Sequence, residues 1–246
     1  MSTARQRAAM GAPADPPVHR VALVTGANRG LGFEVARQLA ARGCSVLLGT
    51  RDLAKGRQAA KRIGGDAAAV PLDVTDAAQI AELAGWIERE HGRLDVLVNN
   101  AGGHADSSAR AESAAPDEVR AALETNLLGA WQLSSALLPL MRRHRYGRIV
   151  NVTSGCAGVS APDAVGYPAY RVSKAALNAY TRALAAELAG SGILVNAVCP
   201  GWLATGLGGP GGCPVERGAA SVVAAACQPE PGINGALLRD GQRIAW

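Results

Sequence analysis

The chain has 246 residues, a length that fits one α/β domain with a substantial core and disfavours two independent domains. The formal net charge is +5 and aromatic side chains make up only 4% of the residues, so small apolar side chains must supply most of the packing. No apolar run reaches the roughly 20 residues of a membrane span, and none has the form of a signal peptide. We expect a disordered tail at residues 1–19, a single domain at residues 20–246, and no membrane contact.

The cysteines and arginines narrow the choice of compartment and partner. The chain has 5 cysteines, an odd number with no CxxC pair, which favours reduced thiols in a cytoplasmic protein and predicts no metal site. A basic cluster comprises Arg142, Arg143, Arg145 and Arg148. It follows a predicted helix, where cations favour the helix dipole, and has only Tyr146 beside it, so we expect no nucleic-acid partner.

Short apolar runs alternate with amphipathic runs along the whole chain. Predicted strands cover residues 21–24, 45–48, 67–72, 94–98, 148–152, 193–198 and 236–239. Predicted helices cover residues 53–63, 76–91, 170–189 and 215–226, with one more after the first strand and two within 116–146, the second beginning near Asn126. Because parallel strands are joined by right-handed helical crossovers, this alternation predicts a single doubly wound parallel sheet of the Rossmann type, with helices on both faces.

The first strand runs into a glycine-rich turn that opens a helix. The turn holds Gly26, Asn28, Arg29, Gly30, Leu31 and Gly32. Glycine allows a sharp turn and the close approach of backbone N–H groups to a pyrophosphate, which the helix dipole also attracts. An ordinary tight turn between strand and helix looks similar, so the turn becomes a predicted dinucleotide site only together with the residues that follow the other strands.

Ligands of such a sheet bind beyond the carboxyl ends of its strands. Further candidate cofactor residues therefore follow the later strands: Asp73, Val74, Asn100, Ala101, Gly102, Pro200, Gly201 and Thr205. The stretch at residues 199–214 is rich in glycine, proline and small residues, which is typical of a mobile lid.

The end of the second strand bears on the choice between NAD and NADP. Arg51 lies about 20 residues after the glycine turn, where NAD-binding proteins place an acidic residue on the ribose. A guanidinium suits a 2′-phosphate instead, and Arg29 could add a second positive charge. Asp52 offers a carboxylate that could serve a ribose, and both arginines could be ordinary surface charges. Charge favours NADP(H) over NAD.

A second group of residues could carry acid–base chemistry. Tyr170 and Lys174 are four residues apart on a predicted helix, which puts their side chains on one face about 6 Å apart at Cβ. A tyrosine hydroxyl, whose pKa is normally near 10, needs a nearby cation to work near neutral pH, and Lys174 could supply it. Ser154 follows the fifth strand and could donate to a carbonyl oxygen, and Asn126 could fix a water or backbone group behind Lys174. Taken singly, these residues are more often a solvated helix face, a loop serine and a helix cap.

With these motifs in this order, the chain resembles the short-chain dehydrogenase/reductase family from about Val21 to its C-terminus. The resemblance implies that Tyr170 is the general acid/base and that Lys174 binds the nicotinamide ribose and lowers the Tyr170 pKa. It implies that Ser154 orients the carbonyl and that Asn126 supports a proton relay. The family includes monomers, dimers and tetramers, so a homo-oligomer and a monomer both stay open.

The resemblance also assigns the cofactor contacts. It implies NADP(H) selection by Arg29 and Arg51, an adenine contact at Asp73, and a carboxamide or pyrophosphate contact at Thr205. The stretch at residues 49–52 is similar to that of carbonyl reductases in the family. The implied activity is NADPH-dependent reduction of a ketone or aldehyde to an alcohol. The alternative is a sensor or scaffold protein that binds NADP(H) without turnover.

The substrate is a small-molecule carbonyl compound whose identity the sequence leaves open. Candidate pocket residues are His104, Cys156, Tyr167, Trp202 and Leu203, which suggest a bulky or aromatic molecule, although core packing explains each about as well. The interval between Ser154 and Tyr170 is longer than usual in the family, so the loop between them should reshape the substrate mouth.

Overall fold

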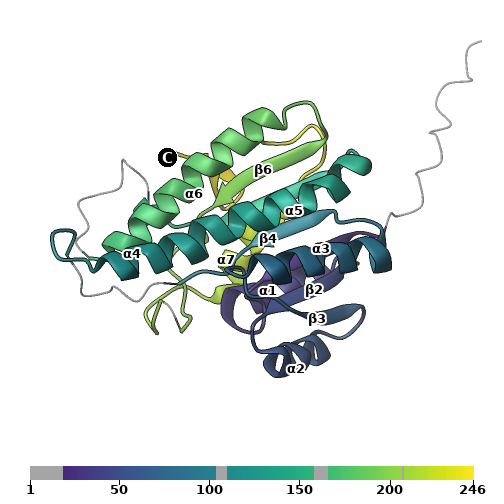
Figure 1. Ribbon diagram of the computed structural model, residues 1–246, viewed down its shortest axis with the longest axis horizontal. Helices are drawn as coiled ribbons and strands as arrows, with labels where there is room; N and C mark the ends of the chain where they lie inside the picture. The colour runs from purple at the N-terminus through teal and green to yellow at the C-terminus, as the bar shows by residue number, and fades with distance from the viewer. Residues whose placement is uncertain (1–18, 104–109, 158–165, 207) are drawn as a thin grey trace, which may run out of the picture.

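The computed structural model describes residues 19–103, 110–157, 166–206 and 208–246 (Figure 1). An eight-stranded sheet with the order β3-β2-β1-β4-β5-β6-β7-β8 runs through it. The strands are β1 Val21–Thr25, β2 Ser45–Thr50, β3 Ala67–Pro71, β4 Val96–Asn99, β5 Gly147–Val152, β6 Ile193–Val198, β7 Leu237–Arg239 and β8 Gln242–Ile244. Neighbouring strands are parallel except β7 and β8, which confirms the predicted doubly wound sheet. The expectations for the tail, for His104 and for much of the loop before Tyr170 lie outside the described residues.

Helices cover both faces of the sheet (Figure 1). They are α1 Gly30–Ala40, α2 Leu53–Ile63, α3 Ala77–His91, α4 Pro116–Leu123, α5 Gly129–Arg143, α6 Pro168–Glu187 and α7 Val215–Ala226, with a π-helical turn η1 at Glu124–Leu128 and a 3₁₀ turn η2 at Gly155–Ala157. Alternate residues of a strand point to opposite faces, so Leu97 packs into the core under α3, α5 and α6, whereas Val98 packs toward α1, α2 and α7. No helix in the described part of the chain combines the length and apolarity that a membrane crossing needs.

The last strand, β8, was not predicted. It folds back on β7 through Asp240 and Gly241, which both have left-handed backbones with φ of 49° and 77°. An Asp-Gly pair is the usual sequence of a two-residue hairpin turn. The Asp-Gly pair could therefore have predicted the hairpin. The two strands beside it are only three residues long, which is too short to show a strand pattern.

Two α-helices, α4 and α5, lie within residues 116–146, as predicted, and the second begins at Gly129, three residues after Asn126. The chain runs from α4 through η1 into α5 without leaving helical backbone angles, and Asn126 lies in the middle of the π-helical turn. A π-helical turn adds a residue to the helix without breaking it. Asn126 is only 1% exposed, so it points inward and does not cap a second helix.

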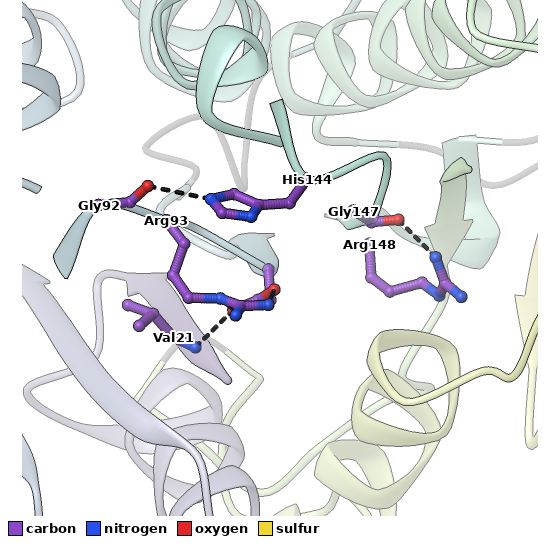
Figure 2. A network of polar contacts seen from close by, with 7 residues as sticks. Val21, Gly92, Arg93, His144, Gly147 and Arg148 are labelled. Carbon is purple, nitrogen blue, oxygen red and sulfur yellow. Dashed lines mark hydrogen bonds and ion pairs between the residues drawn. The ribbon is translucent and has the colours of Figure 1, made fainter. Parts of the chain in front are cut away.

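The sequence suggested that Arg148 belongs to a basic cluster with Arg142, Arg143 and Arg145, but in the structure Arg148 is buried. It lies in β5 and is 1% exposed, with its guanidinium 4.3 Å from the ring centroid of Tyr146. Figure 2 shows its Nη1 directed at the carbonyl of Gly147, which accepts at 2.8 Å. The buried guanidinium braces the amino-terminal edge of the sheet instead of facing a partner.

A buried carboxylate fastens the same edge. Asp95 is fully buried, and its Oδ2 accepts hydrogen bonds from the backbone N–H of Val21 at 2.8 Å and from Nε of Arg93 at 2.9 Å. Its Oδ1 accepts from Nη2 of Arg93 at 2.6 Å. Figure 2 shows Arg93 and Val21 meeting at this point. The carboxylate thus joins the starts of β1 and β4, which are neighbours in the sheet.

We expect Asp95→Ala to lower the free energy of unfolding by about 3 kcal/mol, because it leaves the Arg93 guanidinium and a backbone N–H without their buried partner. Urea unfolding measures this loss. The matched control is Glu88→Gln, which removes an exposed ion pair with Arg143 and should change the free energy by less than about 1 kcal/mol. Equal losses in the two variants would contradict the role of Asp95.

Candidate active site

The glycine turn between β1 and α1 has a tight backbone conformation of the kind that binds phosphate groups. Gly26 and Gly30 have left-handed backbones, with φ of 63° and 56°. A Cβ at Gly32 would lie 2.5 Å from the carbonyl oxygen of Gly26, so only glycine fits there. Arg29, at the N-cap position of α1, makes no side-chain cap hydrogen bond. The first N–H groups of α1 therefore remain suited to an anionic ligand, and the residues fit a dinucleotide.

The loop after β4 is bonded to this turn. The side-chain oxygen of Thr25 accepts hydrogen bonds from the backbone N–H groups of Asn100 and Ala101, at 3.0 and 2.8 Å. The side-chain amide of Asn100 in turn donates to the carbonyl of Thr25 at 2.7 Å. These bonds bring two predicted cofactor segments together at the carboxyl edge of the sheet.

Gly102 connects the cofactor segments to the predicted catalytic residues. A Cβ placed on Gly102 would lie 2.7 Å from Oδ1 of Asn126 and 3.1 Å from Nζ of Lys174. Three elements, the β4 loop, η1 and α6, thus meet at one point. The approach is possible only because position 102 has no side chain.

The loop after β6, whose composition predicts a mobile lid, forms contacts of its own where the structure describes it. Leu203 and Thr205 form bridges with Cys213 and Gly209. The indole N–H of Trp202 donates to the carbonyl of Gly208 at 2.7 Å. A Cβ at Gly30 would come within 3.9 Å of Thr205, so this loop reaches the glycine turn.

The remaining predicted cofactor residues lie along the same edge of the sheet. Arg29 and Arg51 are exposed and form no ion pair with any described residue. Asp73 accepts from the backbone N–H and hydroxyl of Thr75 at 3.0 and 2.8 Å, which fixes a local turn. Asn28 and Leu31 lie in the glycine turn and at the start of α1, Val74 is buried, and Pro200 and Gly201 follow β6. Their cofactor contacts stay predictions.

Asp52, whose carboxylate could accept hydrogen bonds from a ribose, already contacts Lys55. It is the N-cap of α2, and its Oδ1 accepts from the backbone N–H of Lys55 at 3.0 Å while Oδ2 lies 2.7 Å from Nζ of the same residue. The hydrogen bond with the Lys55 side chain, followed by that with its backbone, lowers the pKa of Asp52. The carboxylate therefore has a structural role at the start of α2, and Arg51 beside it is exposed.

Tyr170 and Lys174 are both in α6, which begins two residues earlier than predicted. Burial raises the pKa of Tyr170 to about 12, the thiol of Cys156 acts in the same direction, and a hydrogen bond with Ser154 lowers it. The Lys174 ammonium donates to the carbonyl of Val152 at 2.8 Å and lies 5.9 Å from the centre of the Tyr170 ring. Burial lowers the pKa of Lys174 to about 8.

The expectation that Lys174 lowers the Tyr170 pKa is not met in this structure. Burial outweighs the other influences on the phenol, and the Lys174 ammonium is directed at the Val152 carbonyl. The cause is desolvation, which disfavours the charged form of both groups. Tyr170 is therefore protonated at neutral pH and is suited to donate a proton.

Asn126 is held by backbone and by a residue that the sequence analysis missed. Its Oδ1 accepts from the N–H of Gly103, and its Nδ2 donates to the carbonyl of Gly103, both at 3.1 Å. Nδ2 also donates to Oγ of Ser173 at 2.9 Å, and Ser173 donates to the carbonyl of Tyr170 at 2.8 Å. Ser173, three residues after Tyr170 on the same helix, could have been found from that spacing.

Ser154 lies between β5 and the 3₁₀ turn η2. Its oxygen is 3.1 Å from Sγ of Cys156, and it shares a hydrogen bond with Tyr170. Tyr167, another tyrosine near the start of α6, is 37% exposed and has a left-handed backbone with φ of 56°. The partly enclosed Tyr170 is thus the tyrosine that the fold pairs with the serine.

Fold and site together define a class of protein: a doubly wound α/β protein with a dinucleotide-type glycine turn and a Ser–Tyr pair beside a buried lysine. A family model described as short chain dehydrogenase matches residues 20–210. The chain therefore belongs to the short-chain dehydrogenase family, and it is an oxidoreductase of the ketoreductase type. The family resemblance predicted from the motifs is confirmed.

Three relatives illustrate the similarity. The 3-oxoacyl-(acyl-carrier-protein) reductase FabG of Escherichia coli is 38% identical over 189 residues, which are 76% of this chain and 74% of that protein. The structure of salutaridine reductase from Papaver somniferum covers 89% of this chain and 99% of its own, with 29% identity and a TM-score of 0.79. A metagenomic short-chain oxidoreductase in complex with NADP covers 89% of this chain and 95% of its own, with 32% identity and a TM-score of 0.76.

We expect the buried Lys174 ammonium to cost stability at neutral pH. Its pKa in the folded chain, about 8, lies below the ordinary 10.5, so the cost is fully present below pH 8 and disappears as the pH rises toward 10.5. Lys174→Met should therefore unfold with a free energy up to about 3 kcal/mol higher than wild type at pH 7, and the difference should shrink at pH 10.

Urea unfolding of both proteins at the two pH values measures this difference. Lys61→Met, a change of an exposed lysine in α2, is the matched control and should show no such pH dependence. A difference between Lys174→Met and wild type that is the same at pH 7 and pH 10 would contradict the explanation by burial.

Proposed function

We propose that this oxidoreductase reduces ketones or aldehydes to alcohols with NADPH. The observation that carries the proposal is the hydrogen-bonded pair of Ser154 and Tyr170 at the carboxyl edge of the sheet, beside the glycine turn. NADPH supplies the hydride when it is bound. Tyr170 holds a proton, because its pKa is raised to about 12, and gives it to the carbonyl oxygen as negative charge develops there.

The other site residues prepare that proton transfer. Ser154 donates a hydrogen bond to the carbonyl oxygen and fixes it near Tyr170. Lys174 binds the ribose of the nicotinamide nucleotide, and Asn126 keeps the Gly103 backbone and α6 in place through its three hydrogen bonds. We place the chain in the cytoplasm, since all five cysteines are free.

NADP(H) is the proposed cofactor on the basis of charge. Arg29 and Arg51 provide two exposed guanidinium groups near the glycine turn and the end of β2, and Asp52 is held by Lys55. A 2′-phosphate is a strong acceptor for such donors. The similar metagenomic oxidoreductase was solved with NADP, which supports this choice.

The proposed substrate is a bulky, apolar carbonyl compound. Trp202 follows β6 at the carboxyl edge and is 65% exposed, although its indole N–H is fixed by the carbonyl of Gly208. Gly211 packs against the six-membered part of the indole, where a Cβ would lie 2.9 Å away. A held and exposed indole offers a flat apolar surface, and the 37% exposed ring of Tyr167 adds a second one.

We expect Tyr170→Phe to lower the kcat of NADPH-dependent reduction by at least about a hundredfold, because the proton donor is lost while the ring is kept. NADPH oxidation with a panel of aromatic ketones and small aldehydes measures the loss. Tyr167→Phe is the matched control and should retain the wild-type kcat for small aldehydes. Turnover by Tyr170→Phe at the wild-type rate would contradict the mechanism.

We expect Arg51→Glu to weaken NADPH binding by at least about tenfold, because a charge-assisted hydrogen bond to the phosphate is lost and a repulsion added. NADH binding should change little. Fluorescence titration with both nucleotides measures the two dissociation constants. Arg57→Glu, on the exposed side of α2, makes the same change of charge nearby and should leave the ratio of the two constants as in wild type. Equal losses for NADPH and NADH would overturn the choice of cofactor.

A further inference from the structure

An arginine from the C-terminal hairpin of β7 and β8 lies against Gly155, the residue after Ser154. Arg239 is the last residue of β7, and its Nη2 donates to Sγ of Cys199 at 2.9 Å. Cys199 is 2% exposed and follows β6 immediately before Pro200. The hydrogen bond with Cys199 raises the pKa of Arg239. An otherwise exposed arginine thus directs its guanidinium inward, toward a buried thiol.

The Arg239–Cys199 pair packs against the backbone that carries the serine. A Cβ built on Gly155 would lie 2.5 Å from Nη2 of Arg239 and 3.4 Å from Sγ of Cys199. Gly155 is not among the glycines with a left-handed backbone, so a side chain here would meet no conformational strain but would have to displace the Arg239 guanidinium. The guanidinium therefore supports the chain between Ser154 and Cys156 at contact distance.

The contact with Gly155 links Arg239 to Ser154 and Tyr170. Ser154 lies 3.1 Å from Sγ of Cys156 and is hydrogen-bonded to Tyr170. The Arg239–Cys199 pair lies against Gly155, which directly follows Ser154 in the chain, so it is close to the serine and, through the serine, to the phenol.

Arg239 forms no ion pair with Asp240, the acidic residue next to it in the chain. Asp240, its neighbour in the chain, lies 3.2 Å from Nη2 of Arg217 in α7. The guanidinium of Arg239 thus keeps its hydrogen bond to sulfur although an acidic side chain is adjacent. This arrangement favours a role for Arg239 at Cys199 over a role in a surface ion pair.

We propose that Arg239 is a positioning residue for carbonyl reduction, which holds Ser154 within hydrogen-bonding distance of Tyr170 through Cys199 and the Gly155 backbone. This inference rests on the proposed function. It assigns a role in the active site to the C-terminal hairpin, which lies beyond the residues matched by the family model. A small displacement of the serine would cost turnover and leave nucleotide binding intact, because Ser154 lies between β5 and η2 and not in the glycine turn.

A double-mutant cycle with Arg239→Ala and Gly155→Ala tests the contact. Arg239→Ala should lower kcat about tenfold with an unchanged KM for NADPH. Gly155→Ala should do the same, because its methyl group displaces the guanidinium. In the double variant the methyl group meets no guanidinium, so kcat should fall no further than in Arg239→Ala alone. Losses that multiply in the double variant, or a wild-type kcat in Arg239→Ala, would overturn the inference.

Further variants separate positioning from a general loss of structure. Arg239→Lys keeps a donor and should retain more of the wild-type kcat than Arg239→Ala, and equal losses would count against the inference. Arg243→Met, on β8 of the same hairpin, should leave kcat unchanged. If Arg239→Ala does not fold, Cys199→Ala removes the same hydrogen bond from the other side and should give the same drop in kcat, whereas a wild-type kcat would overturn the inference.

Tyr170→Phe, assayed in parallel, distinguishes the two proposals. Wild-type turnover that does not depend on Tyr170 would overturn the proposed function and this inference together. Turnover that depends on Tyr170 but shows multiplicative losses in the cycle would overturn the role of Arg239 alone.

Discussion

The active site depends on a buried ammonium group that joins the central sheet to the longest helix. Lys174 is 4% exposed, and its hydrogen bond to the Val152 carbonyl fixes the start of α6 against the end of β5. Tyr170 is one turn before it on α6, and Ser154 is two residues after Val152. The bond therefore sets the relative position of the two residues that share a hydrogen bond in the site. Burying a cation opposite a neutral carbonyl costs stability, and we attribute its retention to the chemistry at this edge.

The amino-terminal and carboxyl edges of the sheet have different roles. At the amino-terminal edge, Asp95 and Arg93 form a buried pair with good geometry that ties β1 to β4. At the carboxyl edge, the same two strands end in backbone that is held by Thr25 and Asn100 and lacks side chains at Gly26 and Gly102. Rigid anchoring at one edge allows the other to place open backbone donors and a buried lysine close to a ligand.

The sequence predicted what depends on local pattern and missed what depends on contacts between distant residues. Apolar runs marked the parallel strands to within a few residues, because most of these strands are buried on both faces. The π-helical turn that carries Asn126 could not be predicted, since such a turn shows no distinct periodicity. Arg148 looked like its neighbours in the chain, and only the fold places the Tyr146 ring and three carbonyl groups around it.

The expectation that Lys174 lowers the Tyr170 pKa was not met for the same reason, because a pKa also depends on contacts between distant residues. Spacing on a helix predicts that Tyr170 and Lys174 share a face, but it carries no information on solvent or on which acceptor the ammonium takes. In the structure both groups are desolvated, and desolvation acts on them in opposite directions: the phenol retains its proton more strongly and the ammonium releases it more readily. A phenol with a pKa near 12 is a proton donor across the neutral range, whereas alcohol oxidation requires the phenolate as a base. Both shifts come from burial, which the whole fold creates and which the spacing of the two residues in the sequence does not contain.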